Sequence, residues 1–240
     1  DCRFGKNWLQ TISEAYIQSS ADMIVIPVEM KTNRGFLSKF QQLDYLALQM
    51  VTAGAFGRGK PILCSGANLA FKKKSYLEAI QSTPGQNYLS GDDVFLLQAF
   101  KKQAFKIKYL KAAQSMVHTH PSSTLKEFLF QRMRWGGKTP GYQDRFAIGT
   151  ALIVFVLNIW TAALLLFSLF YSTTILLWAA LIIVKTSTDW KFLNAGKRFF
   201  SAQIKPFHFL MFSIVYPFYI TVAGTGSLFL KERWKARKGK

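Results

Sequence analysis

The sequence predicts an α/β domain followed by membrane-spanning α-helices. Up to about residue 145, short apolar runs typical of strands alternate with segments of helical periodicity. Beyond that point, residues 147–184 and 207–230 contain no Asp, Glu, Lys or Arg. We therefore expect a soluble part at residues 1–145 and a membrane region at residues 146–240.

The soluble part contains the alternation that favours an α/β fold. Residues 21–28 and 63–71 are apolar and residues 105–110 alternate with period two, so all three predict strands. Residues 35–51 and 93–102 carry apolar side chains at helical spacing. Two segments rich in Gly and Pro predict loops between these elements, at residues 54–61 and 83–87.

The last helix before the membrane region is predicted at residues 124–135. Thr124 and Glu127 have the spacing of a capping box at its start, and Gly136-Gly137 end it. Too few residues separate this helix from the first apolar run for another domain to fit there. We therefore expect an interfacial helix on the bilayer surface.

The two uncharged runs predict three spans. A hydrocarbon core of about 30 Å needs about 20 apolar residues in a helix. We place the spans at residues 147–166, 169–184 and 207–230. Buried helices of a soluble protein are the rival interpretation, but such helices rarely run 38 residues without a charge.

The net charge of +19 divides almost evenly, with 20 basic and 10 acidic residues before residue 147 and 11 and 2 after it. Basic residues follow span two (185–205) and span three (231–240), and both groups favour the cytoplasmic side. Three full spans cannot satisfy both. Either the basic tail lies outside, or residues 207–230 form a re-entrant or in-plane element, broken at Pro217. Anionic lipid explains the charge, so we expect no nucleic-acid partner.

Two groups of side chains suit transfer chemistry. Asp92 and Asp93 precede an apolar helix, where either is a general base or simply an N-cap, and the motif alone favours the cap. Gln131, Arg134 and Trp135 share one helical face, where Arg suits a diphosphate and Trp suits a sugar or base. Anchoring of this helix to lipid head groups is the alternative interpretation.

The remaining candidates are weaker by themselves. Gly66 and its small neighbours permit close approach of a ligand, or mark a bulge. His118 and His120 face one way in a strand but lack a third metal ligand nearby. Cys2 and Cys64 form no metal motif, and we expect both to be reduced and structural.

The order of these motifs is more specific than any one of them. Asp1-Cys-Arg, then Ser65-Gly-Ala-Asn-Leu-Ala-Phe, then Gly91-Asp-Asp, then Gln131-x-x-Arg-Trp precede the spans. This order resembles the membrane-bound family 2 glycosyltransferases, the group containing cellulose, hyaluronan and poly-N-acetylglucosamine synthases and ceramide glucosyltransferases. The resemblance implies the C-terminal part of a GT-A-like nucleotide-sugar transferase domain.

The resemblance also implies roles for single residues. Asp1 matches the second Asp of a DxD motif that binds Mg²⁺ or Mn²⁺, and its first Asp would lie upstream. Asp93 matches the general base, with Asp92 where the family has Glu. Two groups match substrate-binding segments: Gln131, Arg134 and Trp135 beside the donor diphosphate and acceptor, and Gly66, Ala67 and Asn68 near the acceptor sugar.

The implied activity is inverting transfer of a sugar from a nucleotide-diphosphate sugar to a lipid or growing polysaccharide. The expected location is the cytoplasmic face of a membrane, for example a bacterial inner membrane, and we expect this chain alone to be inactive. The rival from another class is a transporter or scaffold, which needs ionisable groups within its spans. Asn158, His208 and scattered Ser and Thr are the polar residues there.

Overall fold

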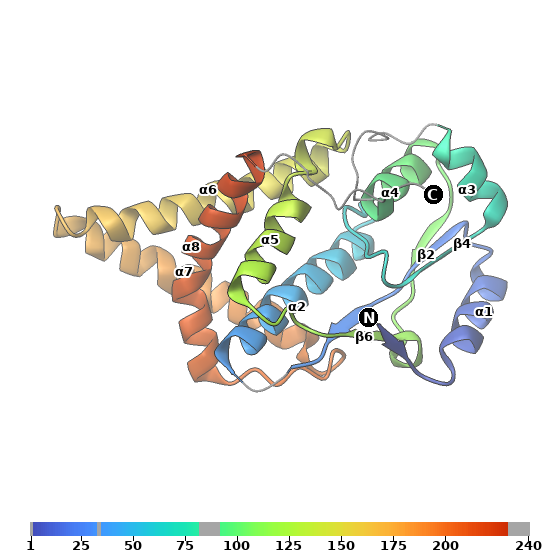
Figure 1. Ribbon diagram of the computed structural model, residues 1–240, viewed down its shortest axis with the longest axis horizontal. Coiled ribbons are helices and arrows are strands. Elements are labelled where there is room, and N and C mark those ends of the chain that lie inside the picture. Colours follow the sequence, from blue (N-terminus) through green and yellow to red (C-terminus); the bar gives the residue numbers. More distant parts are fainter. Residues whose placement is uncertain (1, 33–34, 82–91, 230–240) are drawn as a thin grey trace, which may run out of the picture.

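The computed structural model describes residues 2–32, 35–81 and 92–229 and confirms the mixed α/β class (Figure 1). Helices dominate, and the described strands form two small sheets. The predicted loop at 83–87 and the basic tail at 231–240 lie outside the described residues.

The first sheet has the order β4-β2-β5. Its centre is β2 (Met23–Val25), which pairs antiparallel with β4 (Leu69–Phe71) and parallel with β5 (Ile107–Tyr109). The strand predictions at 21–28 and 105–110 are thus confirmed. The prediction at 63–71 holds for its last three residues, and residues 64–68 form a loop instead.

The second sheet has the order β1-β6-β3. Its centre is β6 (Val117–Thr119), antiparallel to β1 (Arg3–Phe4) and parallel to β3 (Val28–Met30). Both β2 and β3 come from one apolar run, interrupted at Pro27, which has no N–H to donate to a ladder. The chain passes from one sheet to the other at this proline.

Five helices accompany the sheets among the described residues before residue 145. They are α1 (Trp8–Ser19), α2 (Phe36–Gly57), α3 (Lys73–Ile80), α4 (Asp92–Lys102) and α5 (Leu125–Gly136). The single turns η1 (Ala113–Ser115) and η2 (Thr139–Gly141) flank α5 in sequence. The predicted helices at 93–102 and 124–135 correspond to α4 and α5.

Helix α2 continues six residues past its predicted end at residue 51. The loop prediction for residues 54–57 is therefore wrong, although Gly in a helix costs about 1 kcal/mol. Val51 and Ala55 pack with Ile62 and Ala147, and this burial outweighs the cost. Helix α2 also supplies Phe40 to the largest core cluster, which includes residues of α5 and α8.

Three long helices follow: α6 (Arg145–Phe167), α7 (Thr173–Lys197) and α8 (Pro206–Phe229). By length and composition, α6 and α8 are the described helices able to cross a membrane. Helix α7 begins four residues later than the predicted span at 169–184 and runs thirteen residues beyond it. That extension contains Lys185, Asp189 and Lys191, and its polar side chains lower the mean hydropathy of the helix.

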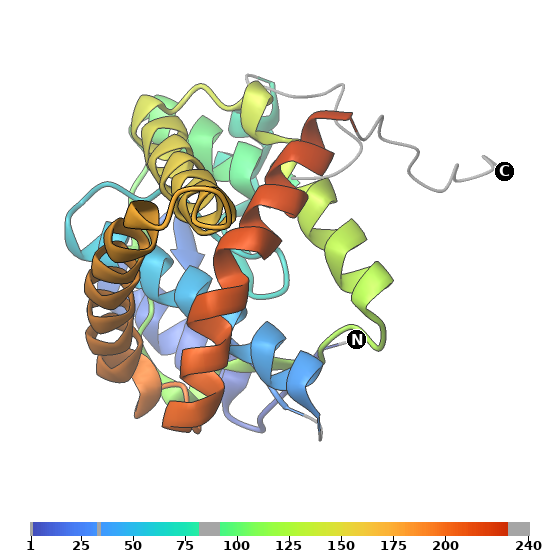
Figure 2. The same ribbon diagram turned by 90° about the vertical axis from the view of Figure 1, so that its left-hand side faces the viewer.

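The long helices have two different settings. Helices α6 and α7 lie side by side as a hairpin that extends away from the sheets (Figure 1). Helix α8 crosses the base of this hairpin alongside α5, as both views show (Figure 2). Pro217 lies inside α8 without ending it.

Candidate active site

The carboxylate of Asp93 lies at the start of α4, where two backbone N–H groups hold it. Its Oδ1 accepts from Val94 N at 2.8 Å, and its Oδ2 accepts from Gly66 N at 2.9 Å. The bond to Val94 is local and belongs to the helix start, whose dipole also favours the negative charge. The bond to Gly66 spans 27 residues and is not part of a helix cap. Asp93 is therefore oriented toward the loop at residues 64–68.

This loop is open to solvent at the predicted substrate segment. Gly66 and Ala67 are both exposed, whereas Asp93 is half-buried. The structure thus brings Asp93 next to Gly66 and leaves an accessible surface beside the carboxylate. The side chain of Asp92 lies outside the described residues.

Asn68 has a different setting from its two neighbours. Its side chain is 1% exposed. The Nδ2 atom donates to Pro27 O at 2.8 Å and Ser115 O at 2.9 Å, and Oδ1 accepts from Trp8 Nε1 at 3.0 Å. These bonds join the loop to the turn between β2 and β3 and to α1. The buried Asn68 side chain anchors the loop to the protein interior, and its amide is not accessible at the surface.

Cys64 supports Asp93 from the interior. Its thiol donates to the backbone oxygen of Asp93 at 3.2 Å. Burial raises the pKa of the Cys64 thiol well above its usual value, and the nearby Asp93 charge raises it further. A neutral buried thiol is a poor nucleophile, so this contact agrees with the structural role expected for Cys64.

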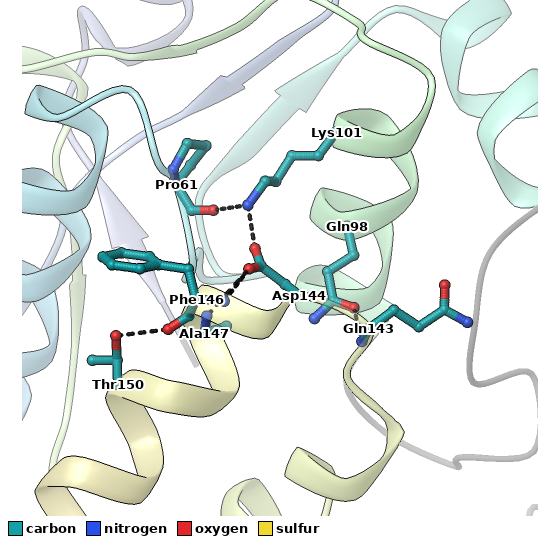
Figure 3. Close-up of polar contacts among 8 residues, drawn as sticks. All are labelled: Pro61, Gln98, Lys101, Gln143, Asp144, Phe146, Ala147 and Thr150. Atoms are coloured by element: carbon teal, nitrogen blue, oxygen red, sulfur yellow. Dashed lines mark hydrogen bonds and ion pairs between the residues drawn. The ribbon is translucent and has the colours of Figure 1, made fainter.

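The far end of α4 is tied to the start of α6 (Figure 3). Lys101 donates to Pro61 O at 2.6 Å and forms an ion pair with Asp144. Asp144 Oδ1 in turn accepts from Phe146 N and Ala147 N and caps α6. Gln98 Oε1 accepts from Gln143 N at 2.9 Å in the same region. The helix that carries Asp93 is thereby joined to the base of the hairpin.

This arrangement favours the charged form of Asp144. Burial raises the pKa of its carboxyl, but the hydrogen bonds from Lys101, Ala147 and Phe146 and the Lys101 charge outweigh burial. The net effect lowers its pKa below the usual value.

The opposite side of the site is formed by α5. Its capping box is present: Thr124 Oγ1 accepts from Glu127 N at 3.2 Å, and Glu127 accepts from Thr124 N at 3.3 Å. Gln131, Arg134 and Trp135 are all partly buried on this helix. Trp135 packs on Tyr45 of α2, with ring centroids 6.5 Å apart.

Tyr45 connects the two sides. Its hydroxyl lies 3.5 Å from Ser65 Oγ, next to the Gly66 that binds Asp93. Burial raises the pKa of Tyr45; the Ser65 contact and the Arg132 charge oppose this, while Cys2 and Asp93 add to it. Through Ser65 and Trp135, Tyr45 thus joins the loop at residues 64–68 to α5.

Sequence reasoning missed both Tyr45 and Arg132. Each lies in a helix at a position whose spacing is that of an ordinary core residue, so the sequence carried no local signal for them. Arg132 is 6% exposed, and a buried Arg next to a substrate motif is recognisable only after its partner has been located.

The described residues alone do not form a metal site. They contain no group of three or more His, Cys, Asp or Glu side chains that could hold an ion. His118 instead pairs its Nδ1 with Glu29 Oε2 at 3.0 Å, in the second sheet. Asp1, the predicted ligand, lies outside the described residues.

An oriented carboxylate beside an exposed loop, in an α/β domain joined to long apolar helices, is typical of an enzyme active site. The family model described as "Glycosyl transferase family group 2" matches residues 1–222, and the chain belongs to this glycosyltransferase family. No curated protein sequence matches the chain significantly. The resemblance seen in the motif order is thus confirmed at the level of the family.

Proposed function

We propose that this chain carries the acceptor-side catalytic residues of an inverting glycosyltransferase. The enzyme moves a sugar from a nucleotide-diphosphate sugar to a lipid or growing polysaccharide. The observation that carries the proposal is the Asp93 carboxylate, held between the Gly66 N–H and the start of α4 and connected through Tyr45 to Trp135. Residues 1–145 form the C-terminal part of a GT-A-like domain in this proposal, and residues 146–240 form the membrane region.

Asp93 acts as the general base. Each of its oxygens accepts one backbone N–H and keeps lone-pair capacity for a further proton donor. The acceptor hydroxyl gives its proton to Asp93 while its oxygen forms a bond to the anomeric carbon. The bond from that carbon to the diphosphate oxygen breaks, and the nucleoside diphosphate leaves with the electron pair. Attack opposite the leaving group inverts the configuration.

The donor side belongs to α5. Arg134 supplies forked donors for the diphosphate, Gln131 supplies an amide, and Trp135 supplies a flat face for a sugar. Asp1 remains the proposed ligand of Mg²⁺ or Mn²⁺ through the resemblance.

The acceptor side belongs to the loop at residues 64–68. Gly66 and Ala67 are exposed beside Asp93 and offer their backbone to the acceptor sugar. Asn68 has its amide engaged by three protein partners, so we assign it the role of positioning this loop.

The exposure of α6 and the contacts of α8 support a membrane placement. Most of α6 is uncovered, including Leu152, Ile153 and Trp160, which supports insertion of the α6–α7 hairpin. Helix α8 touches the soluble helices at both ends: His208 lies 3.2 Å from Lys39 of α2, and Gly226 lies against Met133 of α5.

Those two contacts are separated by about 27 Å along α8, close to the thickness of a bilayer core. If α8 spanned the membrane, Lys39 of α2 and Met133 of α5 would lie on opposite faces of the bilayer. We therefore favour the in-plane alternative for residues 207–230, which places both basic segments on the cytoplasmic side. A green fluorescent protein fused to the C-terminus should fluoresce, and an alkaline phosphatase fusion should be inactive. An active phosphatase fusion would show that the tail is outside.

The test of the activity uses the full-length protein in isolated membranes and a panel of labelled nucleotide-diphosphate sugars. Membranes containing the protein should transfer label from one donor into a lipid or polymer and release nucleoside diphosphate. Membranes carrying Asp93→Asn at the same protein level should not. Failure of every donor in the panel would reject the proposed transferase activity.

A further inference from the structure

A buried charge pair lies directly behind Trp135. Arg132 Nη2 of α5 is 2.8 Å from Asp44 Oδ2 of α2, and the two side chains are 5% and 3% exposed. The pair joins the helix that carries the substrate motif to the central helix of the core. Arg132 occupies an unspecified position inside the motif Gln131-x-x-Arg-Trp, and Asp44 lies outside it.

The guanidinium of Arg132 lies between two aromatic rings of its own helix. Its central carbon is 4.2 Å from the centroid of Trp135 and 5.1 Å from that of Phe128. A planar cation against an aromatic face is attracted by the ring electrons, most strongly for Trp and when water is excluded. The orientation of Arg132 thus constrains the plane of Trp135.

Asp44 connects the same pair to α8. Its Oδ2 accepts from the Tyr219 hydroxyl at 3.3 Å, and the Tyr219 ring stacks on Phe128 with centroids 5.1 Å apart. Burial raises the pKa of Asp44, although the Arg132 charge and the hydroxyls of Tyr219 and Tyr216 oppose this. The permanent charge of Arg132, 2.8 Å away, favours the ionised form of Asp44 against burial.

Stability alone does not explain this arrangement. Replacing a buried ion pair with apolar residues of similar volume is often neutral or stabilising. Here Nε and Nη1 of Arg132 are also buried without a hydrogen-bond partner among the described residues, which adds a further cost. What the pair provides, and an apolar pair would not, is a fixed plane behind Trp135.

We propose that Arg132 and Asp44 are positioning residues for sugar transfer, which hold Trp135 in the orientation that receives substrate. This inference rests on the proposed function of the Asp93–Trp135 site. Tyr219 of α8 binds Asp44, and Asp44 pairs with Arg132. A change in the packing of α8 would therefore affect Trp135 through these three side chains.

The first test is Arg132→Lys in the full-length protein. Lys keeps a positive charge near Asp44 but has no plane to stack on Trp135. We expect a similar protein level in membranes and a fall in kcat/KM for the donor of about tenfold or more. Wild-type kcat/KM in this variant would overturn the inference.

A double-mutant cycle then tests whether Arg132 acts through Trp135. Trp135→Phe keeps a ring but has a weaker attraction for a cation. We expect the combined loss in Arg132→Lys/Trp135→Phe to be smaller than the product of the two single losses, because both variants disturb one contact. Losses that simply multiply would mean that Arg132 does not act through the ring.

The last arm separates positioning from folding. Arg132→Met combined with Asp44→Leu removes both charges together, so we expect the thermal stability of the wild type and the low activity of Arg132→Lys. Wild-type activity in this pair would show that the charges serve folding alone. If the wild type transfers sugar and all these variants are equally active, only this inference is refuted. If the wild type transfers no sugar, the proposed function is refuted.

Discussion

The two sides of the candidate site are held in different ways. On the Asp93 side, the carboxylate is fixed by backbone N–H groups of Val94 and Gly66, next to an exposed loop. On the Trp135 side, the ring is held by contacts with the side chains of Tyr45 and Arg132.

This difference determines how each side responds to substitution. Backbone donors persist when neighbouring side chains change, so the Asp93 side depends chiefly on Asp93 itself. The Trp135 side depends on packing among α2, α5 and α8, and distant substitutions in those helices reach it. We therefore expect mutations to separate catalytic chemistry from substrate orientation.

The largest loss should follow Asp93→Asn, which keeps the shape and loses the proton acceptor. A general base contributes about 10²–10⁴-fold to rate, so kcat in the full-length enzyme should fall by about that factor with little change in donor affinity. Turnover and donor binding measured on the same membranes check this. Asp92→Asn is the matched control and should be milder; if it is the inactive variant, Asp92 is the base.

Trp135→Ala should cost less, because it removes binding surface without removing the base. A hot-spot aromatic contributes about 2 kcal/mol or more, which corresponds to roughly a thirtyfold loss in kcat/KM. Phe130→Ala on the same helix is the control, since Phe130 is 50% exposed and lies outside the motif. If Trp135→Ala keeps full turnover but detaches from membranes, the helix is only an interfacial anchor.

Gly224→Ala should act on the Trp135 side through packing alone. A Cβ there would lie 2.2 Å from the Phe155 ring, where α8 meets α6. Overpacking of this kind costs about 1–3 kcal/mol, so the melting temperature should fall. Gly149→Ala on α6 is the control, because a Cβ added there would meet no atom within 4 Å. Equal melting temperatures in the two variants would contradict the tight contact between Gly224 and Phe155.

The smallest effect should come from Asp144→Asn, since Asn still caps α6 and only the ion pair with Lys101 is lost. Such pairs contribute about 0–1 kcal/mol. The lowered pKa of Asp144 means that its contribution is present above the usual Asp pKa and disappears as pH falls through the folded-state value. Melting curves of wild type and variant should differ slightly at pH 7 and begin to converge below about pH 4, with convergence complete once the pH is below the lowered folded-state value. A difference that widens in acid would contradict this assignment.

The fold was predictable where the signal was local. Thr124 and Glu127 marked the start of α5 because a capping box lies within four residues, and the absence of charge marked α6 and α8. Helix α1 was missed, although Trp8, Ile12 and Ala15 are spaced along one face that packs on β2. Its short length and the motif at its start obscured the periodicity.

The site was predictable only through motif order. Asp93 and Gly66 were identified separately, but the hydrogen bond between them depends on how α4 packs under the loop. The contact between Asp44 and Arg132 joins residues 88 positions apart, each in an ordinary helical pattern. Sequence spacing on one helix cannot reveal a partner on another, so Tyr45 and this pair emerged from the fold.

The configuration of the product at the anomeric carbon tests most directly whether Asp93 and Trp135 form one transferase site. The full-length protein should be incubated in membranes with the donor it accepts, and the new linkage assigned by proton coupling in nuclear magnetic resonance. A base that activates the acceptor opposite the departing diphosphate predicts inversion, so an α-linked donor gives a β-linked product. A product that retains the donor's configuration would contradict a single displacement driven by Asp93.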